Sequence, residues 1–110
     1  MDEVIAAAEK LGRLLSESER YRALRQAEDA VRADPVAGKL VEQIEAQRRK
    51  IAGLEAAMKP VEPADKHELQ RLLSEAHSNA TLQSLARRQA DYMEMMQRVN
   101  AAVQGSLEHK

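Results

Sequence analysis

Apolar residues recur at steps of three and four along almost the whole chain, which is the spacing of one face of an α-helix. The strongest interruption is the segment 59–63, Lys-Pro-Val-Glu-Pro, because each proline fixes its own φ and disfavours helix in the residue before it. The pattern therefore predicts an all-α protein in which two helical arms run antiparallel on either side of this turn. We expect five helices, at residues 2–15, 17–33, 35–58, 64–77 and 79–106.

Residues with capping chemistry mark where these helices begin. Asp34 followed by Pro35 is a strong start signal, because aspartate accepts hydrogen bonds from free backbone N–H groups and proline suits the first helical position. Ser16 with Glu19 fits a capping box for the second helix, and Ser18 is a competing cap.

The two longest predicted helices carry apolar stripes of heptad type, each interrupted by one glutamine. Each glutamine either sets the register or oligomeric state of a helix pair or reaches solvent at the edge of the stripe, and the sequence leaves both open. The chain is rich in alanine and has no Phe or Trp, so its core is thin and a coiled-coil-like homodimer is expected to complete it. The expected core and dimer seam consists of Leu40, Ile44, Gln47, Ile51, Leu54, Gln89, Tyr92, Met96 and Val99.

Length and composition indicate one helical domain over residues 1–110, with the turn at 59–63 and a frayed tail at 105–110. The absence of cysteine excludes a thiolate nucleophile and a thiolate-bound metal. The acidic start lacks the regions of a signal peptide, and no apolar run approaches the ~20 residues of a membrane span. A cytoplasmic protein without membrane contact is expected.

The histidine and acidic residues are not spaced so that they could meet at one point and form a catalytic or metal site. His67 and His77 are ten residues apart, which on a helix means about 15 Å of rise, so they cannot share one ion within a chain. Acidic pairs such as Glu42 and Glu45 lie among basic residues and are typical of a solvated helix face. We expect no enzyme activity, no cofactor, no metal and no small-molecule substrate.

The basic residues offer a surface for partners. The net charge is −1, and no segment has the basic excess of a dedicated nucleic-acid binder. Arginine is favoured at protein interfaces because its planar fork binds carboxylates. The plain alternative is pairing within a helix, Glu45 with Arg49 and Arg87 with Asp91. The partner-binding candidates are Arg48, Arg49, Arg87 and Arg88.

Three stretches of the chain carry a pattern that resembles a known family. The first contains Leu11, Gly12, Ser18, Tyr21, Ala27 and Val31 before Asp34. The second is segment 59–63 followed by Glu68, Leu69 and Leu72, and the third contains Asn79, Leu82, Tyr92, Met96, Val99 and Asn100. Together they resemble the YlbF/YmcA family of small bacterial helical proteins, over nearly the whole chain.

This resemblance implies a cytosolic, dimeric, all-α regulator without enzymatic activity. It implies a link to competence, biofilm formation and sporulation, and to protein complexes that direct messenger-RNA processing by a membrane-bound endoribonuclease. Some members carry cysteines associated with an iron–sulphur cluster, and this cysteine-free chain cannot share that feature. The sequence therefore predicts an adaptor that forms a homodimer and binds other regulatory proteins. The alternatives are a direct RNA-binding accessory factor, through Arg48–Lys50 and Arg87–Arg88, and a structural coiled-coil module.

Overall fold

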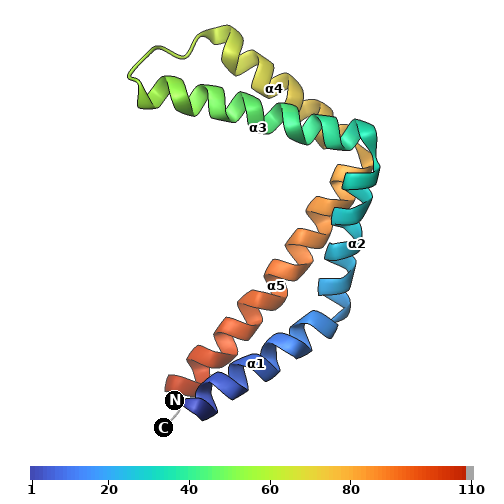
Figure 1. Ribbon diagram of the computed structural model, residues 1–110, viewed down its shortest axis with the longest axis vertical. Helices are drawn as coiled ribbons and strands as arrows, with labels where there is room; N and C mark the ends of the chain where they lie inside the picture. Colours follow the sequence, from blue (N-terminus) through green and yellow to red (C-terminus); the bar gives the residue numbers. More distant parts are fainter. Residues whose placement is uncertain (109–110) are drawn as a thin grey trace. The chain divides into compact units, whose positions relative to one another are not determined.

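The computed structural model describes residues 1–108, which form five α-helices and no strand (Figure 1). The all-α, five-helix prediction is confirmed, and every helix end lies within two residues of its expected position. The helices are α1 (Asp2–Glu17), α2 (Glu19–Ala33), α3 (Pro35–Ala56), α4 (Pro63–Ser78) and α5 (Ala80–Glu108).

Contacts between the helices divide the chain into two compact units, which are described separately. The hairpin unit comprises residues 29–84 and contains α3 and α4. The terminal unit comprises residues 1–28 and, among those described, 85–108. Both α2 and α5 contribute residues to each unit, and the expectation that the chain folds as a single domain stays a prediction.

The core of the hairpin unit lies between α3 and α4, which run antiparallel (Figure 1). Leu40 and Ile44 project from one face of α3 and bury Leu72 of α4, which is only 2% exposed. The sequence predicts both α3 residues in a core or dimer seam, and in this unit they pack against Leu72 of the chain's own α4. Partly buried residues complete the cluster: Leu69, Ala76 and Leu82.

Asp34, between α2 and α3, forms hydrogen bonds to both α3 and α5. Asp34 caps α3 as expected, since its Oδ1 accepts from the backbone N–H groups of Val36 at 3.0 Å and Ala37 at 3.2 Å. The hydroxyl of Thr81, in the first turn of α5, donates to Asp34 Oδ2 at 2.8 Å. The Thr81 hydroxyl and the two backbone donors lower the pKa of Asp34. One carboxylate therefore satisfies free helix donors and links α3 to the start of α5.

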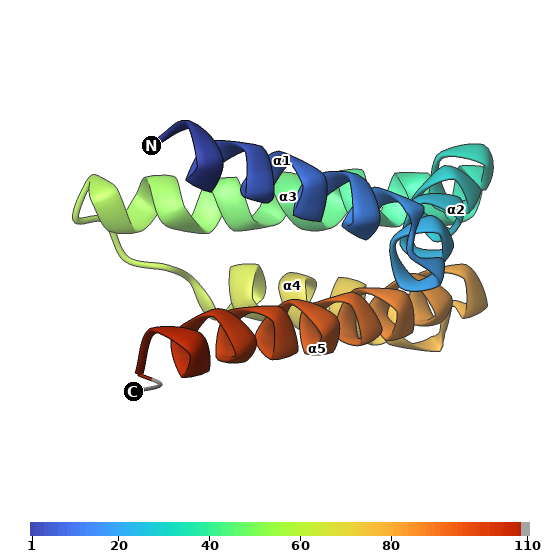
Figure 2. The same cartoon turned by 90° about the horizontal axis from the view of Figure 1, so that it is seen from below.

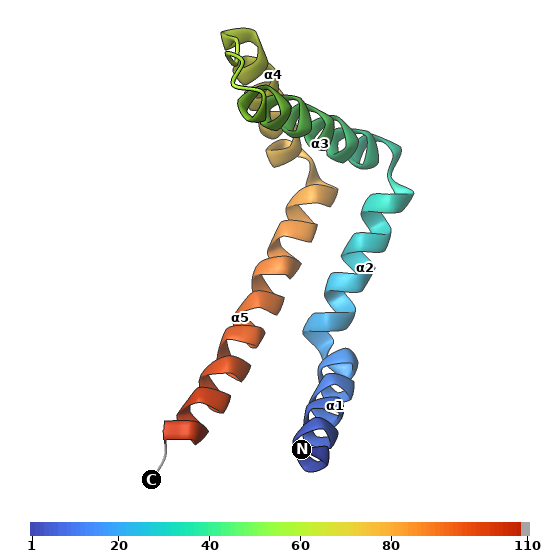
Figure 3. The same ribbon diagram turned by 60° about the vertical axis from the view of Figure 1, so that its left-hand side comes forward.

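The break between α1 and α2 falls at Ser18 (Figure 3). Ser18 Oγ accepts from the backbone N–H of Tyr21 at 3.2 Å and donates to the carbonyl of Leu15 at 2.6 Å. The competing cap thus prevails over the box of Ser16 and Glu19, because Ser16 Oγ donates to the carbonyl of Arg13 instead. In the terminal unit, α5 runs antiparallel to α1 and α2 (Figures 1 and 3).

Helix α3 ends at Ala56, two residues before its expected end, and a loop leads to α4 (Figure 2). Lys59 donates to the carbonyl of Leu54 at 2.8 Å and Met58 to that of Glu55 at 3.1 Å, which is the bonding pattern of a Schellman motif. Met58 adopts a φ of 56°, in the left-handed region that usually takes glycine. The helix is therefore stopped by its own C-terminal motif before the prolines are reached.

At its other end the chain is helical through Glu108, two residues beyond the expected end of the last helix. The remaining two residues of the expected frayed tail, 109 and 110, lie outside the described residues. Fraying of the tail in solution stays a prediction.

The buried Leu72 generates the first testable prediction. Leu72→Ala should lower the free energy of unfolding by about 2–5 kcal/mol, because it leaves a cavity among Leu40 and Ile44. Leu73→Ala is the matched control, since Leu73 is 38% exposed, and it should cost less than about 1 kcal/mol. Urea unfolding followed by circular dichroism measures both, and equal losses for the two variants would contradict this description of the core.

The left-handed backbone conformation of Met58 leads to the second testable prediction. Met58→Gly should stabilise the protein by about 0.5–1 kcal/mol, because it relieves a steric cost of roughly 1–2 kcal/mol that exceeds glycine's extra chain entropy. The Met58 side chain is 93% exposed, so its removal costs no packing. Met58→Ala keeps the strain and serves as the control in the same unfolding measurement. The motif is not as described if the Gly and Ala variants are equally stable.

Candidate functional site

The end of the hairpin near the turn is held by Asp65, which is 8% exposed in the first turn of α4. Lys50 Nζ lies 2.8 Å from Asp65 Oδ1, and the backbone N–H of Glu62 donates to Asp65 Oδ2 at 3.3 Å. Gln47 Nε2 donates to the backbone carbonyl of Asp65 at 2.9 Å. Gln47 therefore connects α3 to α4 within one chain.

The ion pair shifts the titration of both partners. The hydrogen bond from Lys50, followed by the N–H of Glu62 and the charge of Lys50, holds the pKa of Asp65 below its usual 3.8 despite the opposing effect of burial. The same contact raises the pKa of Lys50 above its usual 10.5. Both groups are therefore charged across the physiological range. Because Lys50 is paired with Asp65, the run Arg48–Lys50 is not a set of three free cations.

The seam residues of α5 lie in the terminal unit, where they are less buried than those of α3. The ring of Tyr92 packs against Tyr21 of α2, with centroids 5.9 Å apart and the rings tilted by 57°. Met96 and Val99 are half-buried, as are Ile51 and Leu54 in the hairpin unit, and Gln89 is exposed. Gln89 thus lies on an open face of the chain.

Two of the four candidate arginines lie in the hairpin unit and two in the terminal unit. Arg48 and Arg49 are exposed on α3, and Arg87 and Arg88 are exposed on α5. Within residues 1–108 neither expected pair, Glu45 with Arg49 or Arg87 with Asp91, is formed. Asp91 instead lies 3.8 Å from Arg88.

A polar groove of about 450 Å³ lies between α2 and α5 in the terminal unit. Arg20 spans the two helices, because its Nη1 donates to the backbone carbonyl of Asp91 at 2.9 Å and lies 3.7 Å from Glu94 Oε1. Of the sequence-derived candidates only Arg88 lines it. Arg22 was not among those candidates, although three of the first seven residues of α2 are arginines, Arg20, Arg22 and Arg25. This arginine groove is lined by Glu19, Arg20, Arg22, Ala23, Gln26, Arg88 and Asp91.

The terminal unit also exposes large apolar side chains. Neither α1 nor α5 contains a buried residue. Single exposed apolar residues are ordinary, but several in a unit where Ala27 alone among residues 1–28 and 85–108 is buried form a surface suited to a partner. This apolar surface consists of Met1, Val4, Ile5, Leu14, Met93, Val103 and Leu107.

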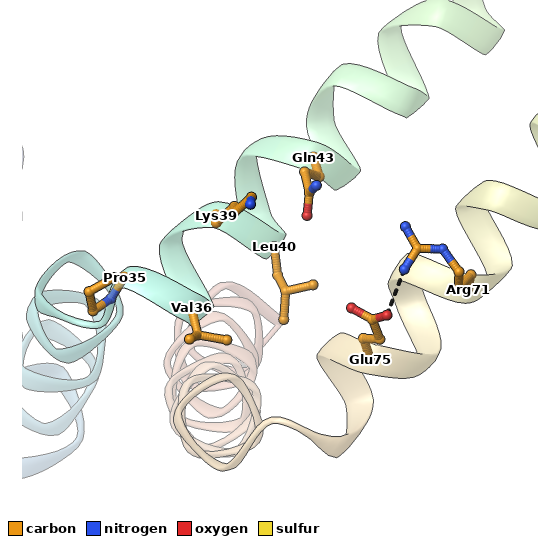
Figure 4. A pocket seen from close by; sticks show the side chains of 7 residues that line it. All are labelled: Pro35, Val36, Lys39, Leu40, Gln43, Arg71 and Glu75. Atoms are coloured by element: carbon orange, nitrogen blue, oxygen red, sulfur yellow. Dashed lines mark hydrogen bonds and ion pairs between the residues drawn. The ribbon is translucent and has the colours of Figure 1, made fainter.

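A second groove, of about 480 Å³, lies between α3 and α4 in the hairpin unit (Figure 4). Leu40 and Val36 supply its apolar part, and Arg71 and Glu75 form an ion pair of 2.6 Å on its opposite wall. Lys39 and Gln43 complete the α3 side. The paired charges and the aliphatic residues give this groove no nucleophile with an adjacent base.

Within residues 1–108, no three His, Cys, Asp or Glu side chains are grouped so that they could hold a metal ion. None of the helices in that part of the chain is both long and apolar enough to cross a bilayer.

Comparisons with known proteins find a family and a fold. The family profile described as "Control of competence regulator ComK, YlbF/YmcA" matches residues 4–108. The fold is similar to that of RicA from Bacillus subtilis, solved in complex with RicF, with a TM-score of 0.82 and 12% identity over 96% of this chain and 93% of that one. It is also similar to a protein of unknown function (DUF964) from Bacillus stearothermophilus, with a TM-score of 0.76 and 19% identity over the same shares. A comparison with curated proteins finds no match.

The Lys50–Asp65 pair generates a prediction of pH dependence. A carboxylate whose folded pKa is lowered stabilises the fold above its unfolded value, and this contribution disappears as the pH falls through the folded pKa. Stability should therefore drop below pH 3.8, and Asp65→Asn should be less stable than the parent at pH 7 but lose less on acidification. Thermal melting between about pH 2 and 7 measures this.

The control for that experiment is Glu55→Gln, which removes an exposed carboxylate from the same end of α3. Its acid dependence should match that of the parent, because Asp34 and Glu68, whose pKa values are also lowered, remain in both. If Asp65→Asn and Glu55→Gln respond alike to acid, the pair does not stabilise the hairpin.

Proposed function

This chain belongs to the YlbF/YmcA family, and from that premise we propose that it is a non-enzymatic helical adaptor that regulates through protein–protein contacts. The family description links these proteins to control of the competence regulator ComK. The proposed compartment is the cytoplasm, and the proposed partners are a second copy of the chain and other regulatory proteins.

The observation that carries this proposal is the weak burial of the terminal unit, in which Ala27 is the one buried residue among residues 1–28 and 85–108. Its helices expose large apolar side chains that include Val4, Ile5 and Leu14, each at least half exposed. Burial of such side chains contributes roughly 1.5–3 kcal/mol each, so a helix that leaves them in water forgoes most of its tertiary stabilisation. A partner that covers these side chains supplies the missing burial.

A second copy is the first partner that we propose for the apolar surface. Two-fold dimers are the commonest oligomers and place the same patch of both subunits in contact. The charges around the patch are compatible with this pairing. Residues 2–17 carry four acidic and two basic side chains, whereas residues 85–98 carry three arginines and two acidic side chains. Since these two segments have opposite net charge, contact between residues 2–17 of one copy and residues 85–98 of the other is favoured.

Other regulatory proteins are the second class of partner. RicA, whose fold this chain shares, was solved together with RicF, and that relative therefore acts in a protein complex. By analogy we propose that this chain joins complexes that affect competence, biofilm formation, sporulation or messenger-RNA processing. Its exposed arginines, Arg48, Arg49, Arg87 and Arg88, are proposed contacts to such partners. Direct RNA binding has less support, because Lys50 is already paired with Asp65.

The function is tested by changing the apolar surface. Val4→Glu combined with Leu14→Glu should raise the dimer dissociation constant about tenfold or more, because two interface side chains become charged. The double variant should also lose a partner that the parent captures from its native cell and that is identified by mass spectrometry. Sedimentation measures the first effect and affinity purification the second.

Met58→Glu is the matched control, because it adds a carboxylate at an exposed apolar residue of the hairpin loop. It should leave both the dimer and the captured partner unchanged. The proposal is wrong if the parent protein sediments as a monomer and captures the same proteins as the double variant.

A further inference from the structure

We propose that the arginine groove between α2 and α5 binds an acidic, carboxylate-rich segment of a protein partner. This inference rests on the adaptor function and names one partner chemistry and the residues that recognise it. The groove holds about 450 Å³ and presents three guanidinium groups on two helices, those of Arg20, Arg22 and Arg88. That volume accommodates a few extended residues of a peptide.

The three arginines are held differently, and this decides which of them is available. Arg20 is fixed by the carbonyl of Asp91 and by Glu94, and it ties α2 to α5. Arg88 has only a long ion pair of 3.8 Å with Asp91. The guanidinium of Arg22 makes no hydrogen bond or ion pair within residues 1–108. Arg20 therefore positions the wall of the groove, and Arg22 and Arg88 can turn their planar forks to a ligand.

The charge of the groove fits a carboxylate ligand. Three arginines line it together with two acidic residues, Glu19 and Asp91, which leaves one net positive charge. Arg87, next to Arg88 on α5, adds another exposed cation without an ion pair among residues 1–108. A guanidinium binds a carboxylate through two parallel hydrogen bonds, so two available forks recognise two acidic side chains at a fixed spacing.

The same features disfavour a nucleic acid as the ligand. A phosphate backbone carries a charge on every nucleotide and favours a continuous row of cations, whereas Glu19 and Asp91 interrupt this groove. Binding of single strands relies on aromatic side chains that stack on bases. The two tyrosines of the terminal unit, Tyr21 and Tyr92, pack on each other and are half-buried. An acidic peptide can instead place neutral residues opposite the two carboxylates.

The test uses the full-length protein and a fluorescent peptide of about 12 residues in which Glu and Asp alternate with Gly and Ser. The parent should bind this peptide but not its Gln and Asn counterpart, with weaker binding as salt rises from about 50 to about 200 mM. Arg22→Glu combined with Arg88→Glu should weaken binding about tenfold or more. Arg20 is left unchanged because its contacts hold the two helices together.

Lys59→Glu combined with Lys66→Glu is the matched control, because it makes the same charge change at exposed cations of the hairpin unit. It should keep peptide affinity within about twofold of the parent. Circular dichroism checks that both double variants keep their helices, and Arg22→Gln with Arg88→Gln replaces the reversal if the Glu variant unfolds.

The proposal is overturned if the peptide does not bind, if both double variants lose affinity equally, or if an RNA oligonucleotide of the same charge binds more tightly than the peptide. Failure of the adaptor function gives a different result, namely a parent protein that neither self-associates nor captures a partner. A parent that dimerises and captures its partner but ignores the peptide refutes the groove alone.

Discussion

The burial of Leu72 by Leu40 and Ile44 is the packing contact on which the hairpin unit depends. The chain has few bulky apolar residues and much alanine, so the area that its helices can bury is limited. The hairpin uses that area by placing three leucine or isoleucine side chains between two antiparallel helices. Helices α1 and α5 bury no residue fully, and several of their large apolar side chains are exposed to water.

Because this core is small, polar side chains also hold the helices of the hairpin unit together. Asp34 and Asp65 each satisfy backbone donors at a helix start, and each also binds a group on another helix, Thr81 or Lys50. Free helix ends are costly to leave without partners, and a short carboxylate can serve two donors at once. The two aspartates thus fix both ends of α3 relative to its neighbours in the hairpin unit.

One unit of the chain holds a core and the other exposes surfaces for binding, an arrangement that suits a protein that acts by binding partners. The hairpin unit has its own core, whereas the terminal unit offers an apolar surface and, between α2 and α5, the arginine groove. An apolar surface supplies affinity, since burial is not directional, and paired guanidinium groups supply selectivity, since their hydrogen bonds require a ligand of matching geometry. The proposed adaptor uses both kinds of contact in one unit.

The helices themselves were determined by local sequence. Apolar spacing predicted all five, and Asp34 with Pro35 marked the start of α3 correctly, because a cap acts within a few residues of its own position. Local sequence was a weaker guide where two residues could cap the same helix, as Ser16 and Ser18 could for α2. It also gave no sign of the left-handed φ of Met58, because that conformation is usually adopted by glycine.

The interactions between helices were decided only by the tertiary structure. Gln47 binds the carbonyl of Asp65, 18 residues away, and Arg20 binds that of Asp91, 71 residues away. Heptad spacing shows that such residues share a face of their helix but not which helix that face meets. The pairing of Leu40 with a helix of its own chain, and the meeting of Arg22 with Arg88 in one groove, depend on how the turns direct the helices in space.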